Sequence, residues 1–236
     1  IVPNGPSNEI SGCVFKNITS TSTTMNNFIK ATGPLLFENN VFESDELLSN
    51  QPGILWYNTN SNLAIVNCSF IRHNTQSSSD GHILTINSDN YPNVNFESCK
   101  FIDCSNTETK TLVKLSCSRC SINFTNCLIS FNHPSVSCKI LTDVNPNVIF
   151  DRCNIINPNA IQITQNTVQG QFKFTKNHIQ TVNNNLIDMA KNPGTIEMSN
   201  NVFEDVSVNG QYFIKIIHRQ EQISLNYNTF SNFTAK

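Results

Sequence analysis

The stretch VNFESCKF at residues 94–101 is one copy of a phrase that recurs along the whole chain. Each copy reads apolar-x-apolar-x-x-(Cys or Asn)-x-(Phe or Ile), although the first copy, NEISGCVF, is degenerate. The copies begin 24 to 31 residues apart and lie at 8–15, 35–42, 63–70, 94–101, 122–129, 148–155, 172–179, 196–203 and 223–230. Self-similarity at this period indicates a solenoid, in which each repeat buries the apolar side of its neighbour.

A second apolar phrase lies between the copies, as in FIKA at 28–31, LVKL at 112–115 and FIKI at 213–216. These runs are too short for helices and favour β-strands. Each repeat therefore predicts a strand, a turn, a second strand, a tight bend and a third short strand. We expect an all-β fold, a right-handed single-stranded parallel β-helix of about nine coils with three short strands per coil. The handedness follows from the right-handed preference of parallel crossovers. We expect residues 1–236 to form a single domain, which is a segment of a longer solenoid.

The repeat resembles that of parallel β-helices in the pectate-lyase-like superfamily, in which an inward Asn ladder occupies the bend between the second and third strands. Phrases such as NCSF at 67–70 and SCKF at 98–101 look most like polymorphic-membrane-protein-type β-helices and protist surface proteins. The resemblance implies an extracellular or cell-surface location. It also implies a structural ladder made of Asn40, Cys68, Cys99, Cys127, Cys153, Asn177, Asn201 and Asn228.

The nine cysteines leave at least one thiol without a partner in the chain. The ladder cysteines are interpreted as free thiols that fill the core, because buried Cys behaves as a small hydrophobe. Cys104, Cys117, Cys120 and Cys138 lie in or near expected turns and are better candidates for disulfide bridges. The CxxC of Cys117 and Cys120 is half of a zinc site at most, so no metal site is predicted.

Four N-x-S/T sequences make Asn17, Asn67, Asn123 and Asn232 candidate N-glycosylation sites. Their number carries no weight, because the 38 Asn of this chain give roughly seven such sequences by chance. Their expected positions are outward or in turns, where a glycan is tolerated.

Only 14% of residues are charged and the formal net charge is −2, which gives no reason to expect nucleic-acid binding. No apolar run is long enough for membrane insertion of this segment. The abundant Asn, Ser and Thr are instead typical of frequent turns, since these side chains bond to their own backbone.

A search for catalytic residues centres on the outer face of the first strand, where enzymes of the similar superfamily place their acidic clusters. No carboxylate pair is expected there on adjacent coils, so we predict no catalytic residue, no metal and no cofactor.

The five histidines, at 73, 82, 133, 178 and 218, are each interpreted as surface residues. Trp56 stacks on a sugar ring if it faces outward, and belongs to the core if it faces inward. The outward positions of the first strand are expected to be Lys30, Trp56, Thr85, Lys114, Thr142, Gln162, Asp188 and Lys215.

These observations favour a non-catalytic scaffold, structural or adhesive, that binds glycans or surface proteins through its loops and outer faces. An alternative is a divergent carbohydrate-active enzyme, a polysaccharide lyase or hydrolase. A second alternative is a subunit of an end-to-end filament, because an uncapped β-helix end presents unpaired backbone groups. The expected partners at such ends are further coils of the same chain or a like subunit.

Overall fold

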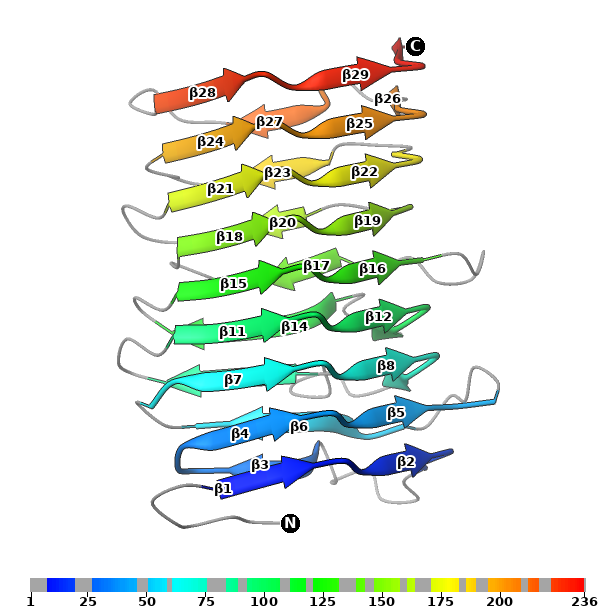
Figure 1. The fold of residues 1–236 in the computed structure, drawn as a ribbon, viewed down its shortest axis with the longest axis vertical. Helices are drawn as coiled ribbons and strands as arrows, with labels where there is room; N and C mark the ends of the chain where they lie inside the picture. The colour runs from blue at the N-terminus through cyan, green and yellow to red at the C-terminus, as the bar shows by residue number, and fades with distance from the viewer. Residues whose placement is uncertain are drawn as a thin grey trace.

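The computed structural model is a stack of short strands that forms a parallel β-solenoid (Figure 1). The described residues contain strands and bends and no helix, and therefore none that would span a membrane. They comprise 8–19, 27–45, 51–58, 61–75, 84–88, 93–106, 111–117, 121–131, 139–142, 147–157, 161–163, 171–182, 186–189, 195–208, 212–216 and 222–235.

Sheet A runs through the length of the molecule and contains nine parallel strands (Figure 1). Equivalent repeat positions pair directly, as in Phe96↔Phe124 and Phe124↔Phe150. Apolar residues therefore stack on the inner side of the sheet, and its outer side carries mostly polar residues. The strands are β1 (Asn8–Ser11), β4 (Leu35–Glu38), β7 (Leu63–Val66), β11 (Asn93–Glu97), β15 (Ser121–Thr125), β18 (Asn147–Asp151), β21 (Gln171–Thr175), β24 (Thr195–Ser199) and β28 (Gln222–Asn226).

Sheet B follows sheet A in each repeat and also has nine parallel strands, each of three residues. Its middle residues point into the core and carry the Phe or Ile that ends the repeated phrase. The strands are β2 (Val14–Lys16), β5 (Val41–Glu43), β8 (Ser69–Ile71), β12 (Lys100–Ile102), β16 (Leu128–Ser130), β19 (Asn154–Ile156), β22 (His178–Gln180), β25 (Val202–Glu204) and β29 (Thr229–Ser231).

The third side of the solenoid is formed by a five-stranded and a three-stranded parallel sheet. Sheet C contains β3 (Asn27–Ala31), β6 (Gly53–Tyr57), β10 (Leu84–Ser88), β14 (Thr111–Cys117) and β17 (Lys139–Thr142). The three-stranded sheet contains β20 (Ile161–Ile163), β23 (Ile187–Met189) and β27 (Ile214–Ile216). Two further pairs are β9 (Asn74–Thr75) with β13 (Ser105–Asn106), and β26 (Ser207–Val208) with β30 (Thr234–Ala235). The prediction of an all-β parallel β-helix with three short strands per repeat is therefore confirmed.

The bend between sheets A and B is made by one residue with a positive φ in every repeat. Asn has a lower cost than most residues in this left-handed region, which explains part of the high Asn content. Its backbone N–H donates to a carbonyl of the following coil, as Asn39 does to Val66 at 3.0 Å. The bend residues are Gly12, Asn39, Asn67, Ser98, Asn126, Arg152, Lys176, Asn200 and Tyr227.

Stacked phenylalanine rings fill much of the core. On sheet A, the rings of Phe96, Phe124 and Phe150 stack with successive centroid distances of 4.7 Å and interplanar angles of 6°. On sheet B, Phe70 and Phe101 stack at 4.9 Å. All five side chains are fully buried. Burial of each ring contributes roughly 1.5–3 kcal/mol, so these columns hold neighbouring coils together.

Three sequence-based expectations are wrong for single residues. Thr85 lies on the expected outer row, in register with Trp56 and Lys114, but it is only 2% exposed. His73 is buried rather than on the surface, because its position follows a second positive-φ bend that turns the chain back into the core. Cys104 occupies the equivalent position one coil later, where it is a buried free thiol and not part of a disulfide.

Candidate functional site

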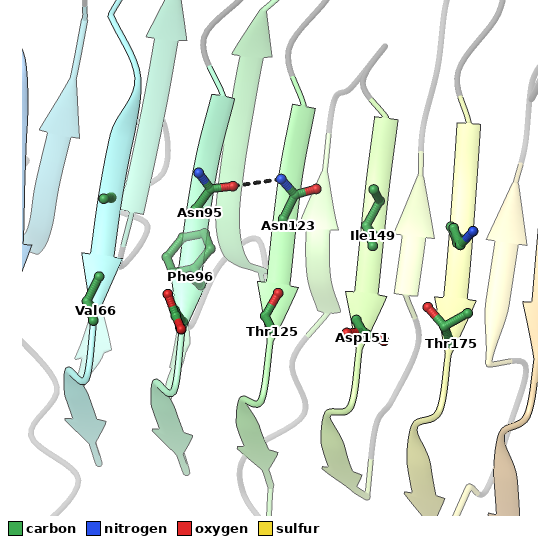
Figure 2. Close-up of a pocket in the computed structure, with 11 residues that line it drawn as sticks. Val66, Asn95, Phe96, Asn123, Thr125, Ile149, Asp151 and Thr175 are labelled. Atoms are coloured by element: carbon green, nitrogen blue, oxygen red, sulfur yellow. Dashed lines mark hydrogen bonds between the residues drawn. The ribbon is translucent and has the colours of Figure 1, made fainter.

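A hollow of about 630 Å³ lies on the outer face of sheet A and spans five strands, β7, β11, β15, β18 and β21 (Figure 2). Alternation along each strand directs every second side chain to this face. The residues that line it are Ala64, Val66, Asn95, Phe96, Glu97, Asn123, Thr125, Ile149, Asp151, Lys173 and Thr175, of which the Phe96 side chain is buried in the core.

The floor of the hollow combines amide groups with short apolar side chains. Asn123 Nδ2 donates to Asn95 Oδ1 at 2.6 Å across β15 and β11 (Figure 2). In the same outer row, Ala64 flanks Asn95 and Ile149 flanks Asn123, while Val66 lies two residues further along β7 (Figure 2). Amide donors and acceptors beside apolar patches are the groups that bind the hydroxyls and the C–H face of a sugar ring.

Charged groups at the hollow are already partly paired. Asp151 Oδ2 accepts from Arg152 Nε at 2.8 Å, and Lys173 Nζ lies 3.1 Å from Glu197 Oε2. Glu97 stands in the same outer row as Asp151, with Thr125 of β15 between them. Two strand spacings separate the backbones of Glu97 and Asp151, which is roughly 10 Å. This face therefore offers polar and ionic contacts to an extended ligand rather than one concentrated charge.

Trp56 does not belong to this hollow. It lies in β6 of sheet C, in register with Lys30 and Thr85, whereas every residue of the hollow belongs to sheet A. Its side chain lies outside the described residues. Of the other expected outer positions, the structure aligns Lys114 with Thr142, and Gln162 with Asp188 and Lys215.

The four candidate glycosylation sites fall into two groups. Asn17, Asn67 and Asn232 are exposed and occupy positive-φ bends. Asn123 instead lies at the centre of β15, half-buried, with its Nδ2 bonded to Asn95 inside the hollow. A glycan on Asn123 would therefore fill the hollow, while glycans on the other three would leave it open.

Inside the bend, the ladder residues form one continuous column. In its C-terminal part, Asn177 N donates to Asn201 Oδ1 at 3.0 Å, and Asn201 Nδ2 donates to Phe174 O at 3.1 Å. Asn201 N in turn donates to Asn228 Oδ1 at 3.0 Å. Asn40 repeats this arrangement near the N-terminus, where its Oδ1 accepts from Cys13 N at 3.0 Å. Each amide thus satisfies a backbone donor and a backbone acceptor of the preceding coil, which would otherwise be buried unpaired.

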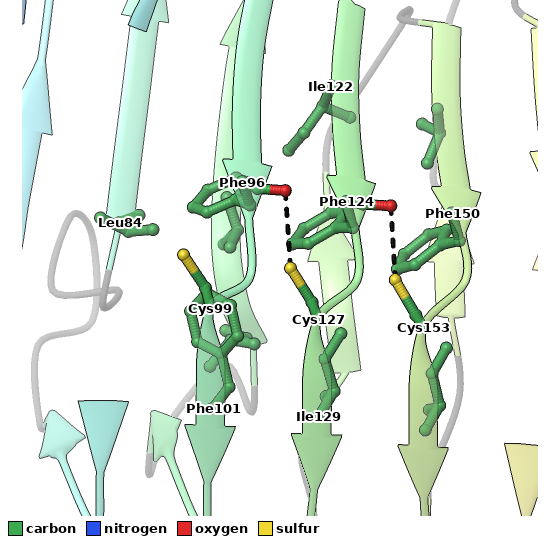
Figure 3. Close-up of a cluster of buried hydrophobic side chains, with 14 of the residues drawn as sticks. Leu84, Phe96, Cys99, Phe101, Ile122, Phe124, Cys127, Ile129, Phe150 and Cys153 are labelled. Carbon is green, nitrogen blue, oxygen red and sulfur yellow. Dashed lines mark hydrogen bonds between the residues drawn. The ribbon is translucent and has the colours of Figure 1, made fainter. Parts of the chain in front are cut away.

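Cysteine replaces the amide in the middle of the column (Figure 3). The Cys127 thiol donates to Phe96 O at 3.5 Å, and the Cys153 thiol to Phe124 O at 3.3 Å. The sulfur also accepts the backbone N–H of the preceding ladder residue, as Cys127 does from Cys99. Hydrogen bonding with Cys127 and Cys68, together with burial, raises the pKa of the Cys99 thiol. The Cys99 thiol therefore stays protonated and is a structural donor rather than a nucleophile.

Two histidines have described side chains. His73 Nε2 lies 2.8 Å from Pro52 O, so this nitrogen carries the proton, and burial lowers the pKa of the imidazole to about 4. His178 Nε2 lies 3.0 Å from Glu204 Oε2 on the outer side of sheet B. A hydrogen bond from the Gln180 side chain and a smaller contribution from the His178 hydrogen bond lower the pKa of the Glu204 carboxyl. His82, His133 and His218 lie outside the described residues, as do Cys120 and Cys138 and the side chain of Cys117.

No group of three His, Cys, Asp or Glu side chains suited to a metal occurs within the described ranges. Sequence reasoning missed the hollow because it searched the first strand of each repeat for acidic clusters, whereas the hollow lies on the second. The outward positions of the second strand were readable from the repeat, but nothing in the sequence marks where that face becomes concave. Comparison of the chain with protein-family models, with curated proteins and with solved structures finds no match.

Proposed function

We propose that this protein is a non-catalytic scaffold that binds an extended glycan along the outer face of sheet A. The observation that carries the proposal is the hollow across five strands, with the bonded pair Asn95–Asn123 between apolar Ala64 and Ile149. Its length along the stack suits several consecutive sugars, because strands repeat about every 4.8 Å. Cell-surface or extracellular display, as in the pectate-lyase-like and polymorphic-membrane-protein-type β-helices that the sequence resembles, belongs to the same proposal.

The first experiment is binding of the 236-residue protein to a glycan array, with and without calcium, followed by affinity measurement on each hit. Asn95→Ala and Lys173→Ala remove contacts in the hollow and should weaken binding about tenfold each, since a lost hydrogen bond to a ligand costs about 1–1.5 kcal/mol. Lys100→Ala, on the outer side of sheet B, is the matched control and should leave the affinity unchanged. Equal effects of Lys173→Ala and Lys100→Ala would contradict a site on sheet A.

The glycosylation state provides a second test of the same face. If the protein is secreted, glycopeptide mapping should find glycans on Asn17, Asn67 or Asn232 and an unmodified Asn123. A glycan found on Asn123 in the ligand-binding form would contradict the hollow as the binding site, because it would occupy the same space.

A specific observation keeps polysaccharide hydrolysis as a second candidate function. Glu97 and Asp151 flank Thr125 in one outer row, at a backbone separation of roughly 10 Å. Inverting glycosidases place two carboxyl groups about 6.5–9.5 Å apart, so the pair is near that range. A product assay on each array hit separates the two functions. Turnover that is abolished by Glu97→Gln and by Asp151→Asn would favour the hydrolase, and binding without turnover the scaffold.

A further inference from the structure

Two carboxylates on the outer face of sheet A have no partner within the described residues. Neither Glu38 in β4 nor Glu97 in β11 makes a side-chain hydrogen bond or an ion pair there. Every other carboxylate whose side chain is described interacts with a partner. These partnered carboxylates are Glu9, Glu43, Asp45, Asp103, Asp151, Glu197, Glu204 and Asp205. Glu38 and Glu97 are therefore the two described acids whose charge the fold leaves uncompensated.

The two carboxylates flank one apolar residue in a single outer row. Glu38 is in register with Val66 of β7, and Val66 is in register with Glu97. Two strand spacings, roughly 10 Å, separate the backbones of the two acids. Ala64 lies two residues before Val66 on the same face, and both side chains line the hollow at its β7 end (Figure 2). An apolar floor at this end of the hollow is thus bounded on two sides by negative charge.

The described residues supply no cation to this end of the face. The outer positions of β4, β7 and β11, and the bends that follow these strands, contain no Lys or Arg. The basic groups of this face lie further along the stack, at Arg152, Lys173 and Lys176. The first two are already paired with carboxylates. The β7 end of the hollow is therefore suited to a ligand group that is positively charged.

We propose that this end of the hollow binds a protonated amine, so that the glycan selected is a polymer of amino sugars with free amino groups. The inference rests on the proposed function, because it assigns a class of sugar to the same hollow. The C–H face of one sugar packs on Ala64 and Val66, and its ammonium group lies between Glu38 and Glu97. A polymer of uronic acids is disfavoured, because its carboxylates would meet like charge.

The amide pair next to this floor favours a sugar over a basic peptide as the source of the amine. Asn95 follows Ala64 in the same outer row and is bonded to Asn123. Their remaining donors and acceptors are available to the hydroxyls of the following sugars. A peptide rich in lysine has the same ammonium groups but no hydroxyls at this position.

The test compares the affinities of glucosamine and N-acetylglucosamine oligomers of equal length for the 236-residue protein, by titration calorimetry at about pH 6. Glutamate is ionised at this pH and the free amine is protonated. The glucosamine oligomer should bind about fivefold to tenfold more tightly, because only the free amine forms ion pairs with the two acids. This preference should nearly disappear in about 1 M salt, which screens exposed charges.

Two variants locate the preference on this face. Glu38→Gln and Glu97→Gln each remove one charge with little change of shape, and each should lower the ratio of the two affinities about twofold to threefold. Glu204→Gln removes the same charge from the outer side of sheet B and should leave the ratio unchanged. A full preference retained in both Glu38→Gln and Glu97→Gln would place the ammonium elsewhere and overturn the proposal.

The outcomes separate this inference from the proposed function. Equal affinity for the two oligomers, or tighter binding of oligogalacturonate, would overturn the amino-sugar assignment and leave glycan binding on sheet A in place. Tighter binding of an oligolysine of the same length would indicate a basic peptide as the ligand and would overturn the assignment as well. Absence of binding to every glycan would overturn both proposals.

Discussion

The coils at residues 61–106 and those at residues 171–208 have the same backbone but distribute their buried polarity in opposite ways. In the first region, the bend before sheet B contains the thiols of Cys68 and Cys99, and the bend after it contains His73 and Cys104. In the second region, the first bend contains buried amides, and the second bend contains Val182 and Val206. The comparison shows that the fold requires a donor and an acceptor at the first bend but does not specify the chemical group. At the second bend it accepts imidazole, thiol or plain hydrocarbon.

The amide region should be the more sensitive of the two to loss of its polar group. Asn201→Leu keeps the branched shape of the side chain but leaves Asn177 N–H and Phe174 C=O buried without their partner. Each unpaired group costs about 1–3 kcal/mol, so the free energy of unfolding should fall by about 4 kcal/mol. Urea unfolding measures this difference.

Asn226→Leu is the matched control, because Asn226 is exposed and its side chain bonds only the nearby Ser224 hydroxyl among the described residues. It should change stability by no more than about 0.5 kcal/mol. A cost of under about 1 kcal/mol for Asn201→Leu would mean that the amide column fills space and does not satisfy the backbone.

His73 should make the stability of the first region depend on pH through the second bend. Burial lowers the pKa of His73 from 6.5 to about 4, so the unfolded chain takes up the proton first as pH falls. Stability from the neutral imidazole is therefore fully present above pH 6.5, is lost between 6.5 and about 4, and is constant below that. The total loss is roughly 3 kcal/mol.

His73→Val places at this bend the residue that the C-terminal region already has there in Val182 and Val206. Unfolding free energies measured across this pH range should show a flatter profile for the variant than for the wild type. Parallel profiles would show that His73 is accessible to protons in the folded state.

The thiol region should tolerate loss of its polar group better. Cys127→Ala removes two weak sulfur hydrogen bonds and a small volume, and should cost about 1.5 kcal/mol. Cys127→Asn should stay within about 1 kcal/mol of the wild type. Its amide would accept from Cys99 N–H and donate to Phe96 C=O, as the Asn40 amide does with Cys13 N–H and Ile10 C=O. Denaturation of both variants, side by side with Asn201→Leu, tests whether thiol and amide are interchangeable. An Asn variant less stable than the Ala variant would contradict that equivalence.

The repeat predicted the strands well because a period-two pattern in a stacked fold determines both register and burial. Phe96, Phe124 and Phe150 could be aligned from sequence alone, and they stack in the structure. The pattern says less about residues outside strands. His73 and Thr85 were expected on the surface, yet both are buried, and His73 follows a second bend that turns the chain back into the core. The hollow on sheet A was not predicted, because concavity depends on the shape of five coils together and not on the residues of any one.

The positive-φ residue that precedes each ladder residue has the same backbone conformation in both regions. Substitutions at this bend should give the smallest of the four changes in stability. Lys176 and Asn200 belong to successive coils, are both exposed, and have φ values of 56° and 57°. A side chain with a Cβ raises the energy of this conformation by about 1–2 kcal/mol, and Asn reduces the cost through local hydrogen bonding. Lys176→Asn should therefore stabilise the protein by about 0.5–1 kcal/mol, and Asn200→Lys should destabilise it by the same amount. Thermal unfolding of the two single variants and of the exchanged pair measures the effect. The exchanged pair should match the wild type, because both bends share one backbone geometry. A pair that differs from the wild type would show that the two bends depend on their ladder neighbours as well as on φ.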